Sequence, residues 1–353
     1  MKSKEPAGIS FFEKHLTEWV VLCMVAGVML GKFAPAVPEF LARFEYANVS
    51  IPIALLIWLM IYPMMMKVDF TSIKNVRREP AGLYLTWVVN WLIKPFTMFG
   101  IAALFFYVVF KSLIPPELAK DYLAGAVLLG AAPCTAMVFV WSHLTKGNPA
   151  YTVVQVATND LIILVAFTPI VVLLLGVGGV TIPWDTLLVS VVLFVVIPLV
   201  GGVLTRSAVI KRKGEEYFHG TFIPKFNHTT IAGLLLTLVL IFSFQGDVIL
   251  GNPLHIVLIA VPLVIQTVLI FFGAYWAGKK LRLCHDVAAP AGLIGASNFF
   301  ELSVAVAITL FSASSPVVLV TIVGVLVEVP VMLALVKFAN RTKHWFPARS
   351  GGG

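Results

Sequence analysis

Two short stretches place chemically distinctive side chains in the middle of long apolar runs. The first, GAAPCT, ends with Pro133, Cys134 and Thr135, and the second, GASNFFE, contains Asn298 and ends with Glu301. Proline deletes a backbone hydrogen bond and interrupts a helix, and the small residues that open both stretches let another helix approach closely. Interrupted spans at corresponding positions in two halves of a chain indicate the binding site of a transporter.

Cys134 carries the most reactive group of the first stretch. A residue directly after a helix break faces the positive end of the following half-helix, which makes the thiolate form more available. The alternative is a small buried residue that only packs between helices. Cys23 and Cys284 are distant in the sequence and show no metal-ligand spacing, so we expect no disulfide framework.

Glu301 is the second candidate, because an acid in the middle of a span is costly and is a functional candidate by default. Phe299, Phe300 and Leu302 would disfavour its charged form, and a carboxyl that exchanges protons suits proton coupling. Asn298, one turn earlier, would hold an unwound backbone in place. The alternative is a structural, hydrogen-bonded acid.

Other polar groups lie inside predicted spans, and one of them is a lysine. Because lysine does not lie unpaired in lipid, we expect Asp160 or Glu328 to neutralise Lys94. Structural pairing and a role in transport both stay open for these groups. Asn159 and Asp160 are the best candidates for proton coupling, since their span directly follows the broken one. The polar residues inside predicted spans are Asn90, Lys94, Asn159, Asp160, Gln266 and Glu328.

The composition is that of a polytopic membrane protein. The chain is 59% hydrophobic and 12% charged, whereas a soluble domain carries about 25% charge. Its 25 Lys and Arg against 17 Asp and Glu lie mainly in short loops, where they set topology, so we expect no nucleic-acid partner. No nucleotide-binding motif and no histidine pair with metal spacing occurs in the sequence, so we expect neither an ATP-driven pump nor a cofactor.

Ten apolar runs predict an all-α protein with ten transmembrane helices. A span needs about 20 mostly apolar residues, and runs this continuous do not build a closed barrel. Tryptophans near the span ends predict an aromatic belt in contact with membrane lipid, at Trp19, Trp141, Trp184, Trp276 and Trp345. The predicted spans are 19–33, 51–66, 83–110, 122–143, 151–177, 184–204, 229–244, 254–278, 288–311 and 316–338.

Lysine and arginine are distributed unevenly between the two sides of this bundle. The asymmetry predicts cytoplasmic termini and an even number of spans in the plasma (inner) membrane. We interpret 205–228 as a solvated cytoplasmic loop. The predicted outer side holds Lys32, Arg43, Lys111 and Lys120. The predicted cytoplasmic side holds Lys2, Lys4, Lys14, Lys67, Lys74, Arg77, Arg78, Lys146, Arg206, Lys211, Arg212, Lys213, Lys225, Lys279, Lys280, Arg282, Lys337, Arg341, Lys343 and Arg349.

A weak internal repeat relates the two halves of the chain. GAA before Pro133 matches GAS before Asn298, a proline loop follows each, and the next span carries Asp160 in one half and Glu328 in the other. Five spans per repeat is an odd number, so the halves would be inverted. We predict repeats at 1–180 and 181–349, and interpret 350–353 as an appended linker.

The two stretches also carry a resemblance to a known family. GAAPCTAMVFVWS at 130–142, followed by Asn148-Pro149 and ATND at 157–160, resembles the fourth and fifth spans of the arsenical-resistance arsenite permeases. NFFEL at 298–302 resembles their ninth span. These permeases belong to the bile acid/arsenite/riboflavin transporter superfamily, and the resemblance covers essentially the whole chain.

This resemblance implies two inverted five-helix repeats with a panel domain and a core domain, in which spans four and nine are broken and cross. It also implies export of trivalent arsenite, and in some members antimonite, by proton antiport. We therefore expect a secondary transporter and no enzyme. The expected substrate-binding residues are Pro133, Cys134, Thr135, Asn298 and Glu301, and the expected proton-coupling residues are Glu301, Asn159 and Asp160.

The main alternative is a sodium-coupled organic-anion symporter on the same fold, against which Cys134 argues. A membrane thiol enzyme would need a base, and His143 lies over two turns along the same helix. A membrane sensor would have no use for the paired breaks. Oligomeric state, antimonite transport, proton stoichiometry, the bonding of arsenic at Cys134 and the roles of Lys94 and Glu328 stay open.

Overall fold

A computed structural model describes residues 15–46, 49–70, 80–135, 137–251 and 253–347. The described chain is helical apart from a small hairpin of β1 (Glu45–Tyr46) and β2 (Val49–Ser50). The predicted linker at 350–353 lies outside the described residues. So do seven of the predicted cytoplasmic basic residues, namely Lys2, Lys4, Lys14, Lys74, Arg77, Arg78 and Arg349.

Every predicted span is occupied by helix. The unbroken ones are α2 (Leu16–Phe33), α4 (Ile51–Met66), α5 to η3 (Pro80–Val109), α9 (Pro149–Val177), α10 to α11 (Trp184–Lys213), α13 (Asn227–Phe244), α15 (Pro253–Lys280) and α18 (Pro316–Arg341). The broken ones are α7 (Pro116–Gly130) with α8 (Met137–Leu144), and α16 (His285–Ala296) with α17 (Phe300–Phe311). Short helices α3 (Ala36–Ala42) and α14 (Gly246–Gly251) lie in connections.

Six helices of the described chain are long and apolar enough to cross a membrane. The protein is therefore a multi-pass membrane protein, and the full count of ten spans stays a prediction. Apolar side chains are widely exposed on the outer helix faces, as at Leu92, Val165 and Leu204. Such a surface suits contact with lipid, where outward apolar side chains carry no hydration cost.

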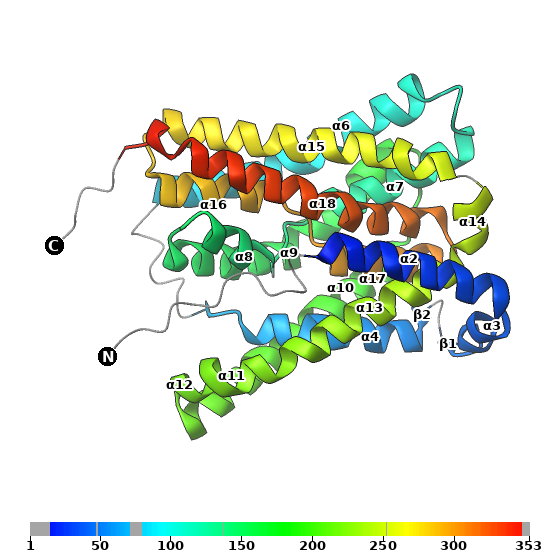
Figure 1. Cartoon of the computed structure of the whole chain (residues 1–353), viewed down its shortest axis with the longest axis horizontal. Coiled ribbons are helices and arrows are strands. Elements are labelled where there is room, and N and C mark those ends of the chain that lie inside the picture. The colour runs from blue at the N-terminus through cyan, green and yellow to red at the C-terminus, as the bar shows by residue number, and fades with distance from the viewer. Residues whose placement is uncertain (1–14, 47–48, 71–79, 136, 252, 348–353) are drawn as a thin grey trace.

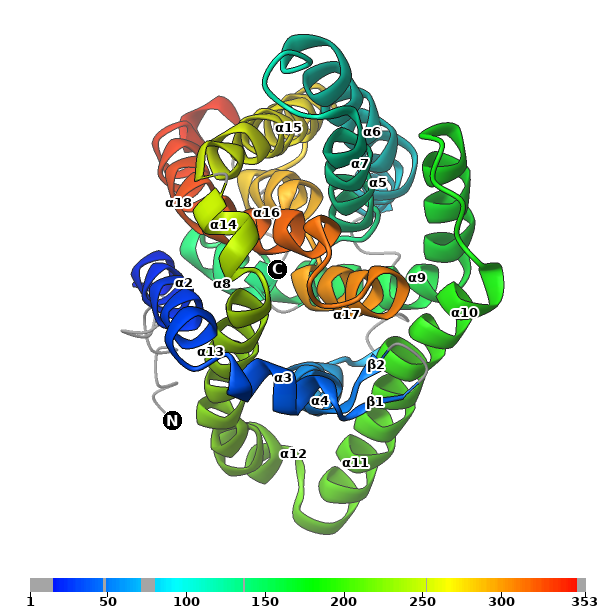
Figure 2. The same ribbon diagram turned by 90° about the vertical axis from the view of Figure 1, so that its right-hand side faces the viewer.

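The helices pack in two groups, which Figures 1 and 2 show from two sides. In the first group, α13 packs on α2 and α4, and α11 packs on α4. In the second group, the first broken helix packs on α18 and α6 through α7, and the second packs on α15, α18 and α5 through α16. Contacts of α18 with α2 and of α17 with α4 and α10 join the two groups. The breaks thus lie within the second group.

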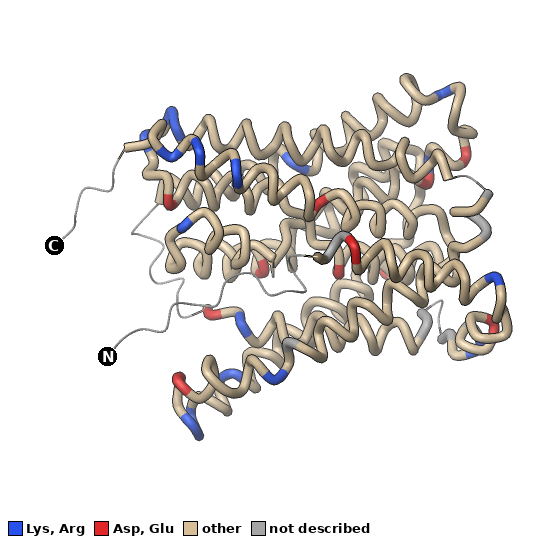
Figure 3. Tube along the Cα trace, in the orientation of Figure 1, with Lys and Arg blue, Asp and Glu red and all other residues tan. Residues whose placement is uncertain are grey.

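Basic residues gather at one end of the molecule (Figure 3). This is the end where α11, α15 and α18 finish, and their last turns hold Lys211, Arg212, Lys213, Lys279, Lys280 and Arg341. The opposite end, where α2 finishes, holds few basic residues, Lys32 among them. The distribution matches the asymmetry on which the cytoplasmic topology was predicted.

The segment 205–228, predicted to be a solvated loop, is mostly exposed as expected, but it is helical and not a loop. Helix α11 continues to Lys213 and is followed by α12 (Glu215–Tyr217), η5 (Phe218–Phe222) and η6 (Ile223–Phe226). An apolar contact lies among the charged residues of this segment. Phe218 is fully buried and forms a small cluster with Met66 and Ile223. Burial of this apolar area stabilises the helical connection.

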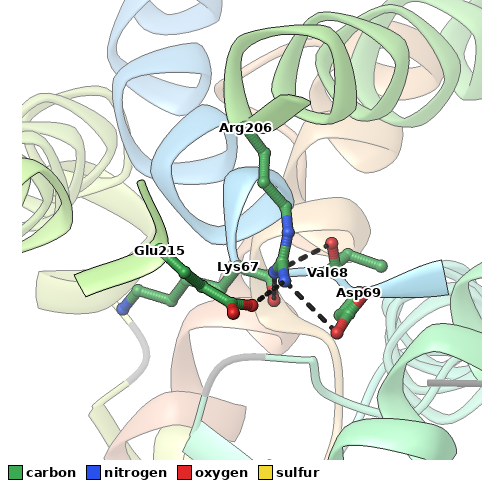
Figure 4. A network of polar contacts seen from close by, with 5 residues as sticks. All are labelled: Lys67, Val68, Asp69, Arg206 and Glu215. Carbon is green, nitrogen blue, oxygen red and sulfur yellow. Dashed lines mark hydrogen bonds and ion pairs between the residues drawn. The ribbon is translucent and has the colours of Figure 1, made fainter. Parts of the chain in front are cut away.

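Arg206 of α11 fastens this segment to the end of α4 (Figure 4). Its guanidinium lies 3.2 Å from the Asp69 carboxylate and donates to the backbone carbonyls of Lys67 and Val68 at 3.3 and 3.5 Å. Glu215 of α12 approaches the same group at 4.0 Å. The planar guanidinium presents several donors at once, so one side chain holds two helices and a following turn together.

The predicted aromatic belt is wrong at Trp141, and three of its other tryptophans are exposed. Trp184, Trp276 and Trp345 are exposed, as lipid-anchoring side chains are. Trp141 is only 2% exposed, because α8 is a half-helix packed between α9 and α16. Trp141 therefore belongs to the core.

Candidate functional site

The two helix breaks meet. Pro133 and Asn298 form an antiparallel bridge between the extended segments. The Phe299 amide donates to the Ala132 carbonyl at 3.1 Å, and the Cys134 amide donates to the Ser297 carbonyl at 3.4 Å. Each broken span therefore satisfies backbone groups of the other, which is how unwound backbone is tolerated inside a membrane protein.

Glycines let the α5–η3 span reach both breaks. A Cβ added at Gly130 would lie 2.6 Å from Met98 Cγ, and one added at Gly295 would lie 2.9 Å from Val89 Cγ1. The span is locally widened into a π-helical turn, η2 (Val89–Ile93), directly before Lys94 and Pro95. Proline lacks the amide that would bond one turn back, and single π-turns often occur at functional sites.

Lys94 lies at the crossing itself. It is fully buried, and its ammonium donates to the carbonyl of Ala132 at 3.4 Å and, through a short contact, to that of Ser297. These two carbonyls stand at the ends of α7 and α16, where helical carbonyls lack intrahelical partners and carry partial negative charge. One positive group thus binds both breaks.

Glu328 of α18 binds the second break from another side. It accepts from the Ser297 hydroxyl at 2.5 Å and from the Asn298 amide at 3.3 Å. Within the described chain Lys94 makes no direct ion pair, but it and Glu328 are close enough to interact electrostatically. Ser297 contacts both groups and links them, and the neutralisation of Lys94 by Glu328 stays a prediction.

Cys134 and Thr135 follow the bridge, and both are buried, with 4% and 3% of their surface exposed. Thr135 Oγ1 and the Asn298 side-chain oxygen have no hydrogen-bond partner among the described residues. Buried polar atoms are nearly always paired with protein or water. These two unpaired oxygens on opposite sides of the bridge indicate a place for a polar ligand.

Glu301 lies in the first turn of α17, two residues after Phe299, and is 8% exposed. The positive end of the helix dipole favours a negative charge there, whereas burial opposes it. Its carboxyl also interacts electrostatically with the carboxyl of Glu328. The break thus places Glu301 in the first turn of the half-helix that follows the crossing.

Asn159 and Asp160 on α9 lie at the edge of this network, and only Asn159 is joined to it. The Asn159 oxygen accepts from Trp91 Nε1 at 3.1 Å and from Asn90 Nδ2 at 3.4 Å, on the turn that precedes Lys94. Asp160 is fully buried, and neither of its oxygens has a hydrogen-bond partner among the described residues. The alternative that Asp160 neutralises Lys94 is therefore wrong.

The substrate-binding and proton-coupling residues expected from the sequence leave out three side chains of the crossing. Lys94 and Glu328 carry a sequence signal, because both are charged and both precede a proline within an apolar run. Ser297 carries no such signal, since a serine among small residues is typical of helix packing. His143, the candidate base of a thiol enzyme, is exposed near the end of α8, whereas Cys134 is buried.

Comparison with known proteins also indicates a transporter. The model of the Sodium Bile acid symporter family matches residues 54–252. The chain is 66% identical to the arsenical-resistance protein Acr3 of Alkaliphilus metalliredigens, over 97% of this chain and 96% of that protein. It is 34% identical to the Acr3 of Corynebacterium glutamicum, over 94% and 90%. It is also 46% identical to an uncharacterized transporter of Synechocystis, over 96% and 91%. These matches class the chain as a transporter and not as an enzyme.

Proposed function

Because the chain belongs to the arsenical-resistance family of arsenite permeases, we propose that it exports trivalent arsenite from the cytoplasm in exchange for protons, through the crossing of its two broken helices. An exporter of this kind acts in the plasma membrane, with both termini cytoplasmic. The ten spans would form two inverted repeats, 1–180 and 181–349, and each repeat would supply one broken helix.

One observation carries the assignment of the site. The Pro133–Asn298 bridge brings the segment with Cys134 against the segment that leads into Glu301. A soft thiol and an ionisable carboxyl, distant in sequence, thereby flank one buried junction with unpaired polar oxygens at Thr135 and Asn298. This combination suits a small neutral polyhydroxy acid.

The Cys134 thiol would bind arsenite reversibly. Trivalent arsenic is soft and prefers sulfur ligands. We propose that Cys134 displaces one hydroxyl of arsenous acid: a sulfur–arsenic bond forms, an arsenic–oxygen bond breaks, and the thiol proton leaves with that hydroxyl as water. The oxidation state of arsenic does not change. A single sulfur bond can be hydrolysed on the outer side, whereas three would retain the metalloid.

Glu301 supplies the coupling. Its ionised carboxylate accepts a hydrogen bond from an arsenic-bound hydroxyl, and protonation removes that acceptor. Proton and arsenite then compete for one site, and competition between two ligands is sufficient for exchange. Asn298, Pro133 and Thr135 position the substrate. Asn159 and Asp160 would form the proton path along α9.

The test is arsenite accumulation in everted membrane vesicles under an imposed proton gradient, in native protein, Cys134→Ala and Glu301→Gln. Both substitutions should abolish gradient-driven accumulation. Cys23→Ala and Cys284→Ala are the matched controls and should retain it, since α2 and the start of α16 hold these residues away from the bridge. Accumulation that follows sodium and survives loss of the Cys134 thiol would contradict the proposal and favour the organic-anion symporter.

A further inference from the structure

We propose that a groove between the ends of α15 and α18 binds one anionic phospholipid, with an acyl chain in the groove and the phosphate at Lys279 and Lys280. The two helices lie side by side and finish at the basic end of the molecule (Figures 1 and 3). The groove has a volume of about 410 Å³, and its lining includes Phe272, Gly273, Trp276, Lys279, Phe338 and Trp345.

Packed aromatic side chains form the walls of this groove. The ring of Phe338 on α18 lies 4.9 Å from that of Phe272 and 5.7 Å from that of Trp345 in η7 (Lys343–Trp345), both edge to face. Tyr275, also in the lining, is 2% exposed, and its hydroxyl lies 2.8 Å from Thr342 Oγ1. Such contacts fix the rings, and ligand clefts of about 300–1,000 Å³ are usually preformed in this way.

The groove is open on its outer side. A Cβ added at Gly273 would meet no atom within 4 Å, so this glycine leaves room beside the rings. Exposed apolar side chains follow α15 at three- or four-residue spacing up to the groove, at Ile265, Leu269, Phe272 and Trp276. In a membrane protein an apolar stripe of this kind faces acyl chains. The shape and polarity of the groove therefore suit a lipid tail.

Two lysines supply positive charge at the basic end of the groove. Lys279 Nζ lies 4.8 Å from the centre of the Trp345 ring, and Lys280 Nζ lies 3.8 Å from that of Trp276. Ring faces attract ammonium groups without neutralising them. Among the residues that the structure describes, no acidic side chain lies within 4.0 Å of either ammonium. Both charges are thus available to a phosphate, which lysine binds as a point charge.

The combination of groove and charge selects an anionic phospholipid over other occupants. Exposed tryptophans such as Trp276 and Trp345 lie at the headgroup level of a bilayer, which is where a phospholipid carries its phosphate. A soluble phosphate compound would leave the apolar groove empty. A second copy of the chain fits less well, because a two-fold interface at this groove would place lysines opposite lysines. Basic pockets between helices on the cytoplasmic side bind anionic headgroups for the same reason.

The experiment is a native mass spectrometry titration of the full chain in detergent, with phosphatidylglycerol or with phosphatidylcholine of the same acyl chains. Native protein should retain one phosphatidylglycerol, with a Kd about tenfold or more below that of phosphatidylcholine. Lys279→Gln combined with Lys280→Gln should lose this preference. Lys211→Gln combined with Arg212→Gln removes the same charge at the exposed end of α11 and should keep it.

Gly273→Leu tests the groove itself, because its side chain would occupy the space of the acyl chain. It should weaken binding of both lipids about tenfold. Gly100→Leu is the matched control, since a Cβ there also meets no atom within 4 Å and Gly100 does not line the groove. The Tm of each variant reports its folding. If Gly273→Leu does not fold, the pair of exposed lysines decides the question alone.

Four results would overturn the proposal. The first is equal affinity of native protein for the two lipids, and the second is native-like phosphatidylglycerol binding by the lysine variant or by folded Gly273→Leu. The third is displacement of the lipid by soluble glycerol phosphate at equal concentration, which would indicate a plain phosphate site. The fourth is a dimer in place of the lipid adduct. Arsenite is absent throughout, so these results are independent of the transport assay.

Discussion

Pro133 and Asn298 form a backbone bridge that joins two helix breaks from opposite halves of the chain. Proline has no amide to donate, so the hydrogen bonds of the crossing come from the amides of Cys134 and Phe299 beside the bridge. The bridge makes the two breaks one structural unit. A change at either break is therefore expected to alter the other.

Arsenite should protect Cys134 from alkylation. In a Cys23→Ala, Cys284→Ala background, the thiol that remains is buried beside the crossing. If it bonds to arsenic, arsenite at about ten times its Kd should slow maleimide labelling about tenfold, since only about one protein in eleven then keeps an unbound thiol. The measurement is the rate of mass addition in intact protein. Labelling at an unchanged rate would exclude an arsenic–sulfur bond at Cys134.

Glu301→Gln should separate binding from coupling. The amide imitates the protonated carboxyl in shape but releases no proton, so gradient-driven accumulation should vanish. Glu301→Asp keeps an ionisable group and should retain part of it. The comparison is made in the same vesicles at equal protein content. Full proton-driven activity of Glu301→Gln would show that the coupling group lies elsewhere, with Asp160 the next candidate.

Ser297→Ala should destabilise the crossing. The substitution removes the hydroxyl that donates to Glu328 at 2.5 Å, and a buried charged acceptor that loses a partner costs about 1–3 kcal/mol. Thermal unfolding in detergent measures the loss. Ser190→Ala is the control, because in the part of the chain that the structure describes the Ser190 hydroxyl donates to the Thr186 carbonyl of its own helix. Equal melting of the two variants would argue against a structural role of the Ser297–Glu328 bond.

Gly125→Ala should be the more harmful of two glycine substitutions. A Cβ there would lie 2.5 Å from the backbone oxygen of Val317, so α7 and α18 would have to separate. A Cβ at Gly100 in α6 meets no atom within 4 Å, and replacing a helical glycine should stabilise by about 0.5–1 kcal/mol. Expression and Tm of both variants test the packing. A Gly125→Ala protein as stable as Gly100→Ala would contradict this close approach.

Arg206→Met should loosen the end of the first helix group without affecting the crossing. The guanidinium links α11 to Asp69 and to two carbonyls at the end of α4, and methionine retains the apolar stem while removing every donor. Limited proteolysis should then cut faster between 205 and 228 than in the native protein. Lys211→Met, on the same helix, is the control. Unchanged cleavage would show that the buried Phe218 holds the segment alone.

The sequence by itself determined the helices and the location of the breaks. In lipid, a continuous apolar run satisfies its backbone hydrogen bonds by forming a helix. Proline at position 133 has no amide to donate, whatever its tertiary surroundings, and so it interrupts the helix. The proposal of Cys134 and Glu301 as site residues rests on a similar local reason, because polar groups are costly in such runs. The helical structure of 205–228 was not predicted, because its many charged residues are typical of a loop. The buried Phe218 packs this segment against Met66.

Only the tertiary structure decided which partners the buried charges take. Lys94 and Ser297 are 203 positions apart, and no local pattern encodes a hydrogen bond across such a distance. From composition, Asp160 and Glu328 were equivalent partners for Lys94, yet the packing of α18 brings only Glu328 to the second break. The meeting of two helix ends around one ammonium is a property of the packed helices, because it arises from where their carbonyls converge and not from any single segment.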